Sequence, residues 1–266
     1  MERMSVHHNN FYSNVLRQPT QVEVILPEPR GLDGQIPARY VRGPQPLPTV
    51  WLLHGLGGDA LSWLRRSTIE SLADQYRVAV VMPQTGRGFY TDMVHGLDYW
   101  TYLTTELPQR MRYVFPLSAD PQENYVMGQS MGGYGALRWA LTMPEQFAAV
   151  AALSPVTDLA RFRQEQVKLI PDFDLNFNPQ HLTATAADVR WLLKQVPATS
   201  ALRVLVATGT RDFLGPMIRE WRPELESQLG ARFTYQEQSG WHDWRLWNEQ
   251  LPSAMHWLVR GRWARV

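Results

Sequence analysis

The feature that most constrains the fold is the segment 128–132, which reads Gly-Gln-Ser-Met-Gly. It follows the strand-like run Asn-Tyr-Val-Met and precedes the helix-like run Gly-Tyr-Gly-Ala-Leu-Arg-Trp-Ala-Leu. In this setting the G-x-S-x-G pattern forms a sharp turn, and the serine hydroxyl projects from the carboxyl edge of the sheet. Side chains in place of Gly128 and Gly132 would collide with neighbouring elements. The pattern predicts a nucleophile at Ser130, against the alternative of an ordinary glycine-rich connection.

Short β-branched runs alternate with longer stretches of helical periodicity after residue 45. The expected strands span residues 49–53, 78–82, 124–127, 148–153, 203–207 and 232–236. The expected helices span residues 62–75, 99–113, 132–141, 217–229 and 244–259. Such alternation is typical of βαβ units, so we expect an α/β fold with a mostly parallel central sheet and helices on both faces.

Two regions depart from this alternation. Residues 21–27 and 38–42 are strand-like and are separated by Pro, Gly and Asp, which predicts an antiparallel N-terminal edge of the sheet. Residues 157–200 contain prolines and clustered Asp and Asn, and they predict a small cap insertion over one end of the sheet. We expect residues 1–266 to form one domain that carries this insertion.

A serine nucleophile needs a base, and the base needs an orienting acid. In the α/β-hydrolase fold, to which the serine pattern points, these residues occur in the order serine, acid, histidine. His181, His242 and His256 follow Ser130 in the chain. His181 lies in the predicted cap, and His256 lies among apolar residues of the last predicted helix, where we expect a core position. His242 lies between the last strand and the last helix, so it is the predicted base.

The acid is expected after the penultimate strand. Asp212 follows the strand expected at 203–207 and is the predicted acid. Asp158 follows the preceding strand and is the main alternative. Asp243 is adjacent to His242, and neighbouring residues seldom reach each other's side chains in the required geometry.

The oxyanion of an acyl-transfer intermediate needs two backbone N–H donors. Met131, directly after the nucleophile, is one candidate; Leu56, in the glycine-rich turn after the strand at 49–53, is the other. His54 begins this turn, and we expect it to be a structural hydrogen-bonding residue rather than a catalytic one. The segment 55–60 also fits the dinucleotide fingerprint G-x-G-x-x-A, but two strands precede it, whereas that fingerprint normally opens the first βα unit.

Composition narrows the partners and cofactors. The formal net charge is +1, so we expect no nucleic-acid or membrane partner. Cysteine is absent, which excludes thiol nucleophiles and disulfides. His7 and His8 lie in a terminus expected to be loose, so we expect no metal and no other cofactor. The N-terminus lacks a signal-peptide pattern, and a cytoplasmic location is expected. Many of the 11 tryptophans are expected in the core, including three in the last helix: Trp244, Trp247 and Trp257.

Several sequence blocks together resemble the esterase D family, and within it the tributyrin esterase branch. They are LLHGLGG at 52–58, SWLRR at 62–66, VVMP at 80–83, GFYTD at 88–92, ELP at 106–108, GQSMGGYGAL at 128–137 and GWHDW at 240–244. The similarity runs from about Phe11 to Trp257. It implies an α/β hydrolase that cleaves short-chain acyl esters through an acyl-enzyme without a cofactor. Carried across by motif, the nucleophile, acid and base fall on Ser130, Asp212 and His242, and the oxyanion donors fall on Leu56 and Met131.

The resemblance also implies alternatives. The family includes S-formylglutathione hydrolases, cinnamoyl or feruloyl esterases and acyltransferases, and its members are commonly dimers or tetramers. The formylglutathione branch typically has His in place of Tyr134 and a Cys in the block that begins at His54, and both departures argue against that activity. A small-molecule ester is therefore the expected substrate. Its expected contacts, each of which could equally be loop packing, are Gly55, Trp63, Phe89, Tyr90 and Trp241.

Overall fold

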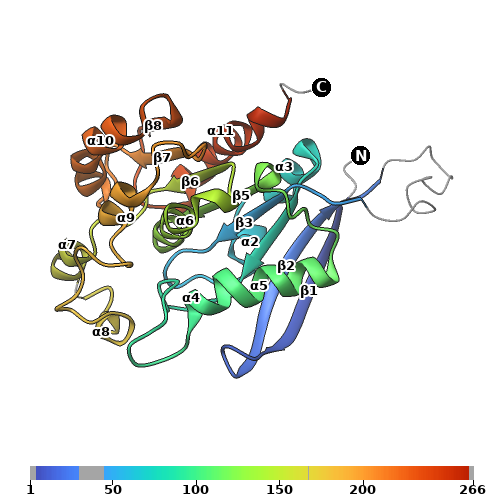
Figure 1. Ribbon diagram of the computed structural model, residues 1–266, viewed down its shortest axis with the longest axis horizontal. Helices are drawn as coiled ribbons and strands as arrows, with labels where there is room; N and C mark the ends of the chain where they lie inside the picture. The colour runs from blue at the N-terminus through green and yellow to red at the C-terminus, as the bar shows by residue number, and fades with distance from the viewer. Residues whose placement is uncertain (1–3, 30–44, 167, 264–266) are drawn as a thin grey trace.

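The structure, a computed structural model, describes residues 4–29, 45–166 and 168–263. Its strands are β1 (Met4–Ser13), β2 (Gln18–Pro27), β3 (Thr49–Leu53), β4 (Ala79–Pro83), β5 (Asn124–Gln129), β6 (Ala149–Leu153), β7 (Arg203–Gly209) and β8 (Phe233–Gln238). They form one eight-stranded sheet in the order β1-β2-β4-β3-β5-β6-β7-β8 (Figure 1). β1, β2 and β4 pair antiparallel, and the remaining pairs are parallel. The predicted mostly parallel sheet with an antiparallel N-terminal edge is confirmed.

The edge strand β1 is absent from the strands predicted from the sequence. Most of its residues are half-buried or exposed, so its sequence lacks the apolar alternation of a strand with one buried face. His7 and His8, expected in a loose terminus, pair instead with Val24 and Glu23 of β2. The other predicted edge strand, at 38–42, lies outside the described residues.

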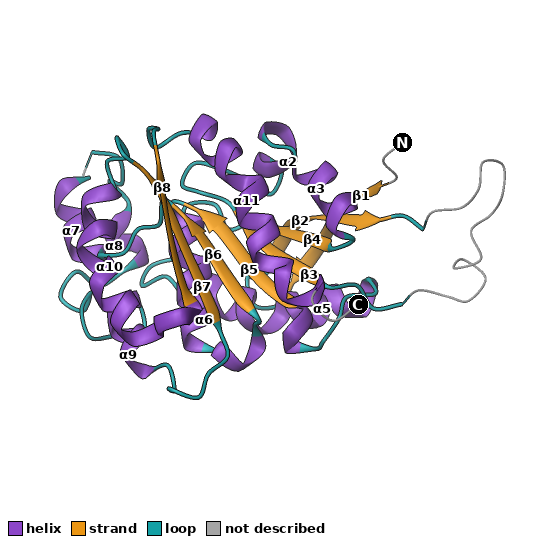
Figure 2. Cartoon of the chain, turned by 90° about the horizontal axis from the view of Figure 1, so that it is seen from above, coloured by secondary structure: helices purple, strands orange, loops and turns teal. Residues whose placement is uncertain are grey.

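Helices cover both faces of the sheet (Figure 2). The longer ones are α3 (Ile69–Tyr76), α5 (Leu107–Val114), α6 (Met131–Thr142), α10 (Gly215–Leu229) and α11 (Trp244–Trp263). All five residues of β3 are buried, because alternate side chains pack against different helices. Val50 and Leu52 belong to the core under α3 and α11, whereas Trp51 and Leu53 belong to the core that contains α5, α6 and α10. A strand buried on both faces reads as a continuous apolar run, which is why β3 has the predicted bounds.

The helix expected at 62–75 is two helices, α2 (Ser62–Arg66) and α3, because Ser67 adopts an extended conformation with φ −141° and ψ 173°. The helix expected at 99–113 is observed as α4 (Tyr99–Thr101), a π-helical turn (Tyr102–Glu106) and α5. His256, expected in the core, is exposed. It lies on the outer face of α11, where the centres of its ring and the Tyr76 ring are 6.2 Å apart.

The segment between β6 and β7, which contains the region predicted as a cap, carries three short helices at one end of the molecule (Figure 1). They are α7 (Leu159–Glu165), α8 (Phe173–Asn176) and α9 (Val189–Gln195). Arg87, from the loop after β4, donates two hydrogen bonds of 2.6 Å to Asp172 in this segment. Phe162 and Phe173 pack on Phe89 of the same loop, with ring centroids 5.9 and 6.0 Å apart. These contacts fasten the segment to the loop after β4.

Candidate active site

Ser130 lies at the carboxyl end of β5, directly before α6, in a tightly constrained backbone. Its φ of 56° and ψ of −119° are unusual for a residue with a side chain, and its N–H donates to the Leu153 carbonyl at 2.8 Å. A Cβ on Gly128 would lie 2.3 Å from the Gly132 oxygen, and one on Gly132 would lie 2.3 Å from the Leu53 oxygen. Only glycine fits at both positions, so the close approach of β5, α6 and β3 forces the turn that presents Ser130.

His242 lies on the loop between β8 and α11, and its ring joins two distant side chains. His242 Nε2 is 2.9 Å from Ser130 Oγ, and His242 Nδ1 is 2.9 Å from Asp212 Oδ1. The ring also packs against Phe213 and Trp247, whose ring centres lie 4.4 and 5.1 Å from its own. A hydrogen-bonded chain of this kind orients the imidazole so that Nε2 can accept the serine proton.

Asp212 follows β7, and its carboxylate is fully buried. Burial alone would raise the pKa of Asp212. The hydrogen bond to His242 and the positive charge of that ring outweigh the effect of burial, and hydrogen bonds from Ser154 and the Leu214 N–H act in the same direction. The pKa of Asp212 therefore lies below its usual 3.8. Ser154 directly follows β6, is buried, has a φ of 48°, and accepts a hydrogen bond from Trp247 Nε1 at 3.1 Å. No sequence pattern singles out Ser154; its one signal is its position at the same sheet edge as Ser130.

The two alternative acids have other partners. Asp158 accepts the Arg161 N–H at 2.9 Å and caps the start of α7. Asp243 accepts the Leu246 N–H at 3.1 Å in the first turn of α11. Each carboxylate therefore occupies a helix N-terminus, where unpaired backbone N–H groups favour it.

His54 has the structural position expected from the sequence. Its ring is buried, Nε2 accepts the Thr85 N–H at 3.2 Å, and Nδ1 donates to the Gly55 carbonyl at 2.9 Å. Burial lowers the pKa of His54 below its usual 6.5, so the ring is neutral at pH 7. The side chain thus connects the glycine-rich turn after β3 to the loop after β4.

A cavity of about 550 Å³ opens beside Ser130 and His242. Gly55 and Phe89, two of the five expected substrate contacts, line it, and so do Leu56 and Met131, the expected oxyanion donors. Met131 is the first residue of α6, so its N–H has no carbonyl partner within the helix.

The other three expected contacts lie outside this lining. Trp63 is buried in the core under α3 and α11, where its Nε1 donates to the Leu53 carbonyl at 3.1 Å. Tyr90 is also buried, and its hydroxyl donates to the His54 carbonyl at 2.8 Å. Trp241 is 59% exposed and stacks beside Arg211.

Trp244, expected in the core, is only partly buried and lines the cavity instead, whereas Trp247 and Trp257 are buried as expected.

Among the described residues, no group of three or more His, Asp or Glu side chains has the arrangement of a metal site. Within the same part of the chain, no helix has the length and apolar character needed to cross a membrane.

Comparison with known proteins finds relatives among esterases and serine hydrolases. The chain is 28% identical over 274 residues to an acetyl esterase of Caldicellulosiruptor saccharolyticus, covering 97% of this chain and 99% of the relative. The fluorophosphonate-binding serine hydrolase F of Staphylococcus aureus superposes with a TM-score of 0.83 at 28% identity, over 96% of this chain and 98% of the other. An S-formylglutathione hydrolase of the same organism superposes with a TM-score of 0.80 at 27% identity, over 97% of this chain and 99% of the other.

The eight-stranded sheet and these superpositions identify the fold as that of the α/β hydrolases, here in a serine hydrolase that acts on ester bonds. The sequence matches the model of the Esterase family over residues 13–258, which is nearly its whole length. The chain therefore belongs to the Esterase family.

Proposed function

We propose that the protein is a carboxylesterase of the tributyrin esterase type, which cleaves short-chain acyl esters through an acyl-enzyme on Ser130. The observation that carries this proposal is the hydrogen-bonded chain from Asp212 through His242 to Ser130, with both links at 2.9 Å, at the wall of the cavity. These distances lie within the range that proton transfer between a nucleophile and its base requires.

In the proposed first half-reaction, Ser130 Oγ attacks the ester carbonyl while His242 Nε2 takes its proton. Asp212 remains ionised, because its pKa is lowered, and stabilises the imidazolium that forms. The N–H groups of Leu56 and Met131 hold the oxyanion. The C–O bond to the alcohol then breaks, and His242 gives its proton to the leaving alcohol oxygen.

In the second half-reaction, water takes the place of the alcohol. His242 removes a proton from the water, and the hydroxide attacks the acyl carbonyl while the same backbone N–H groups hold the oxyanion. The bond to Ser130 Oγ breaks, Ser130 recovers its proton from His242, and the carboxylic acid leaves. All the protons move between these side chains, water and the alcohol, so the proposed reaction needs no cofactor.

S-formylglutathione hydrolysis is the second candidate, since a Staphylococcus aureus protein of that name has a similar structure. Two features support the short-chain ester instead. Position 134 is Tyr rather than His, and its hydroxyl donates to the Ala187 carbonyl at 2.8 Å, so it is committed to the core. The block that begins at His54 contains no cysteine.

The test is Ser130→Ala, assayed with 4-nitrophenyl butyrate and with a fluorophosphonate probe that labels activated serines. We expect kcat to fall about 10⁴-fold or more and labelling to vanish, because the attacking oxygen is gone. Ser253→Ala, which removes a hydroxyl on the exposed side of α11, should keep both signals. Retained turnover by Ser130→Ala would refute the nucleophile assignment. Comparing kcat/KM for butyrate esters and S-formylglutathione separates the two candidates.

A further inference from the structure

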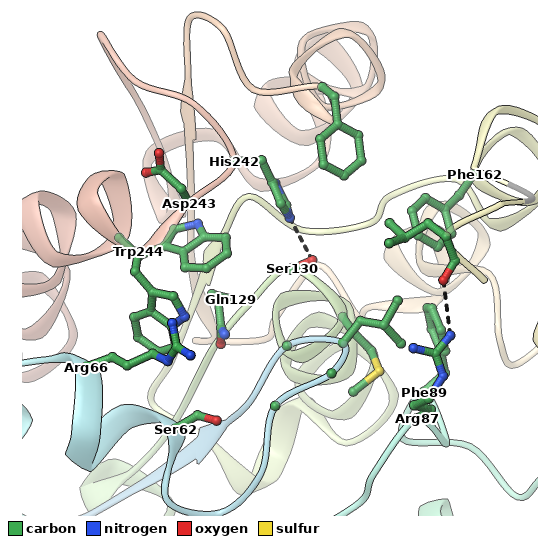
Figure 3. Close-up of a pocket in the computed structure, with 18 residues that line it drawn as sticks. Ser62, Arg66, Arg87, Phe89, Gln129, Ser130, Phe162, His242, Asp243 and Trp244 are labelled. Atoms are coloured by element: carbon green, nitrogen blue, oxygen red, sulfur yellow. Dashed lines mark hydrogen bonds between the residues drawn. The ribbon is translucent and has the colours of Figure 1, made fainter.

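The cavity beside Ser130 has two chemically different sides. On one side lie the aromatic rings of Phe89 and Phe162, together with Arg87, whose charge is paired with Asp172 (Figure 3). On the other side lie the polar side chains of Gln129, Ser62 and Arg66, near the indole of Trp244. A short acyl ester needs the nucleophile and an apolar pocket, but it has no group that would use the polar side.

Arg66 differs from the neighbouring arginines in having no anionic partner among the described residues. Arg65 pairs with Asp59, and Arg87 pairs with Asp172. The guanidinium of Arg66 lies 5.9 Å from the centre of the Trp244 ring, and the structure gives it no ion pair or hydrogen bond within the described part of the chain. An unpaired cation in the wall of a cavity is available to a ligand.

The backbone of Arg66 is anchored, and its side chain is exposed beside Trp244. It is the last residue of α2, and its carbonyl accepts a hydrogen bond from Asn248 Nδ2 at 2.6 Å, which connects α2 to α11. Trp244 packs edge-on against the buried ring of Trp63 at 5.1 Å, so the aromatic surface beside Arg66 is itself supported. The site is therefore anchored to two helices rather than carried on a free loop.

The nearby acidic groups do not neutralise Arg66. Asp59 is engaged by Arg65 and by the Ser62 hydroxyl. Asp243 also lines the cavity, but its carboxylate accepts the Leu246 N–H, and Figure 3 shows it pointing away from Gln129 and Ser130.

A wall of aromatic rings connects Arg66 to the reacting centre. The ring centre of Trp247 lies 5.1 Å from that of His242, and the ring centre of Trp244 lies 5.4 Å from that of Trp247. The two indoles therefore fill the space between the base and the guanidinium of Arg66. The cavity volume of about 550 Å³ is within the range that holds drug-sized ligands. A substrate can therefore extend along the tryptophans while its ester lies at Ser130.

We propose that Arg66 binds a carboxylate carried by the ester substrate. A planar guanidinium pairs with the two oxygens of a carboxylate, and a single cation matches its single negative charge. The amide of Gln129 lines the same side of the cavity and offers a further polar contact. The inference rests on the proposed esterase function and defines its substrate class as esters with an anionic group on either the acyl or the alcohol part.

The experiment compares two matched pairs of esters. For the acyl part, mono-4-nitrophenyl glutarate is compared with 4-nitrophenyl pentanoate; for the alcohol part, 4-butyryloxybenzoate is compared with 4-methylphenyl butyrate. The measured quantity is the ratio of kcat/KM for the charged ester to that for the neutral ester. Comparing this ratio between wild type and variants cancels the intrinsic reactivity of each ester.

We expect Arg66→Met to lower this ratio about tenfold in at least one pair, as expected for the loss of a charge-assisted hydrogen bond. Arg66→Lys should lower it less, because the ammonium keeps the charge without the planar fork. The matched control is Arg65→Met, which removes an adjacent arginine already paired with Asp59 and should keep the wild-type ratio. Added NaCl should reduce the ratio in wild type but not in Arg66→Met.

The pair that responds tells whether the carboxylate belongs to the acyl or to the alcohol part, and either response supports the proposal. Unchanged ratios in both pairs for Arg66→Met, with normal hydrolysis of the neutral esters, would overturn the carboxylate site and leave the esterase function standing. A wild-type enzyme that hydrolyses none of the four esters would overturn the esterase function and this inference with it.

Discussion

Ser130 and His242 are held in position by different kinds of interaction. The backbone fixes Ser130, through the bond of its N–H to Leu153 and through the glycine contacts around the turn. Side chains fix His242, which lies on a loop and depends on Asp212, Phe213 and Trp247. The first arrangement combines the consecutive residues of the β5–α6 turn with backbone groups at the ends of β3 and β6. The second joins residues from two separate loops and from α11.

This difference predicts how the two parts respond to substitution. Many backbone hydrogen bonds together maintain the geometry of the turn, so a substitution of one neighbouring side chain should leave the turn at Ser130 in place. The orientation of His242 depends on few side-chain contacts, and the loss of one of them should change the rate directly. Substitutions on the His242 side should therefore reduce kcat without unfolding the protein.

The largest expected effect is that of Asp212→Asn, which should lower kcat by roughly 10³- to 10⁴-fold. An Asn amide can donate to His242 Nδ1, which leaves the proton on Nε2, so the ring can no longer accept the proton of Ser130. The thermal midpoint should change by only a few degrees, because the side chain keeps its shape. Steady-state kinetics with 4-nitrophenyl butyrate and thermal unfolding measure the two effects.

The matched control for this prediction is Asp158→Asn. Asp158 is the other candidate acid but caps α7, a role that Asn fills equally well. Its kcat should remain within about twofold of wild type. A large loss in Asp158→Asn together with a small one in Asp212→Asn would reverse the assignment of the acid.

A smaller effect is expected from Ser154→Ala, which tests how far the side-chain support extends beyond Asp212. Removing the hydroxyl takes away a group that lowers the pKa of Asp212 and leaves the Trp247 N–H without its acceptor. We expect kcat to fall about fivefold to tenfold, which corresponds to one ordinary hydrogen bond. Alanine keeps the Cβ, so the backbone of this turn should remain in place.

The comparison variant is Thr157→Val, which also removes a buried hydroxyl after β6. The structure shows no hydrogen bond for Thr157 Oγ1 within the described residues, so kcat should be unchanged. If Ser154→Ala had the same kcat as Thr157→Val, the support of His242 would end at Asp212.

The parts of the fold that are predictable from the sequence are those with a strong local pattern. β3 has the predicted bounds, because a strand buried on both faces is a continuous apolar run. β5 begins at the predicted Asn124 but ends at Gln129 rather than at residue 127. β1 is missed because an edge strand with two partly exposed faces has no such run. The break between α2 and α3 is missed because the helical periodicity continues across Ser67.

The three predicted residues of the candidate site do meet in the structure, because strand order places the loops after β5, β7 and β8 at one edge of the sheet. The cavity lining was less predictable. Trp63 and Trp244 are both aromatic residues beside loops, yet one is in the core and the other lines the cavity. Which face of a helix turns inward depends on contacts between distant segments, and a single sequence does not show them.

The smallest expected effect concerns His54, a titratable side chain that connects the glycine-rich turn beside Ser130 to the loop after β4. Because burial lowers its pKa, the unfolded chain binds a proton at this ring more readily than the folded protein does. The stabilisation from neutral His54 is therefore complete above pH 6.5, the usual value, and is lost as the pH falls from 6.5 towards the lowered pKa.

In His54→Gln, the amide can replace one of the two hydrogen bonds of the ring but does not titrate. We expect this variant to unfold with a free energy about 1 kcal/mol below that of wild type at pH 8, for the bond that is lost. At pH 5.5 the gap should be narrower, because only the wild type loses stability on acidification. Urea unfolding of both proteins at the two pH values measures the gap. A gap independent of pH would mean that His54 is not held neutral by burial, whereas a narrowing gap would show that the neutral ring of His54 contributes to the stability of the folded protein.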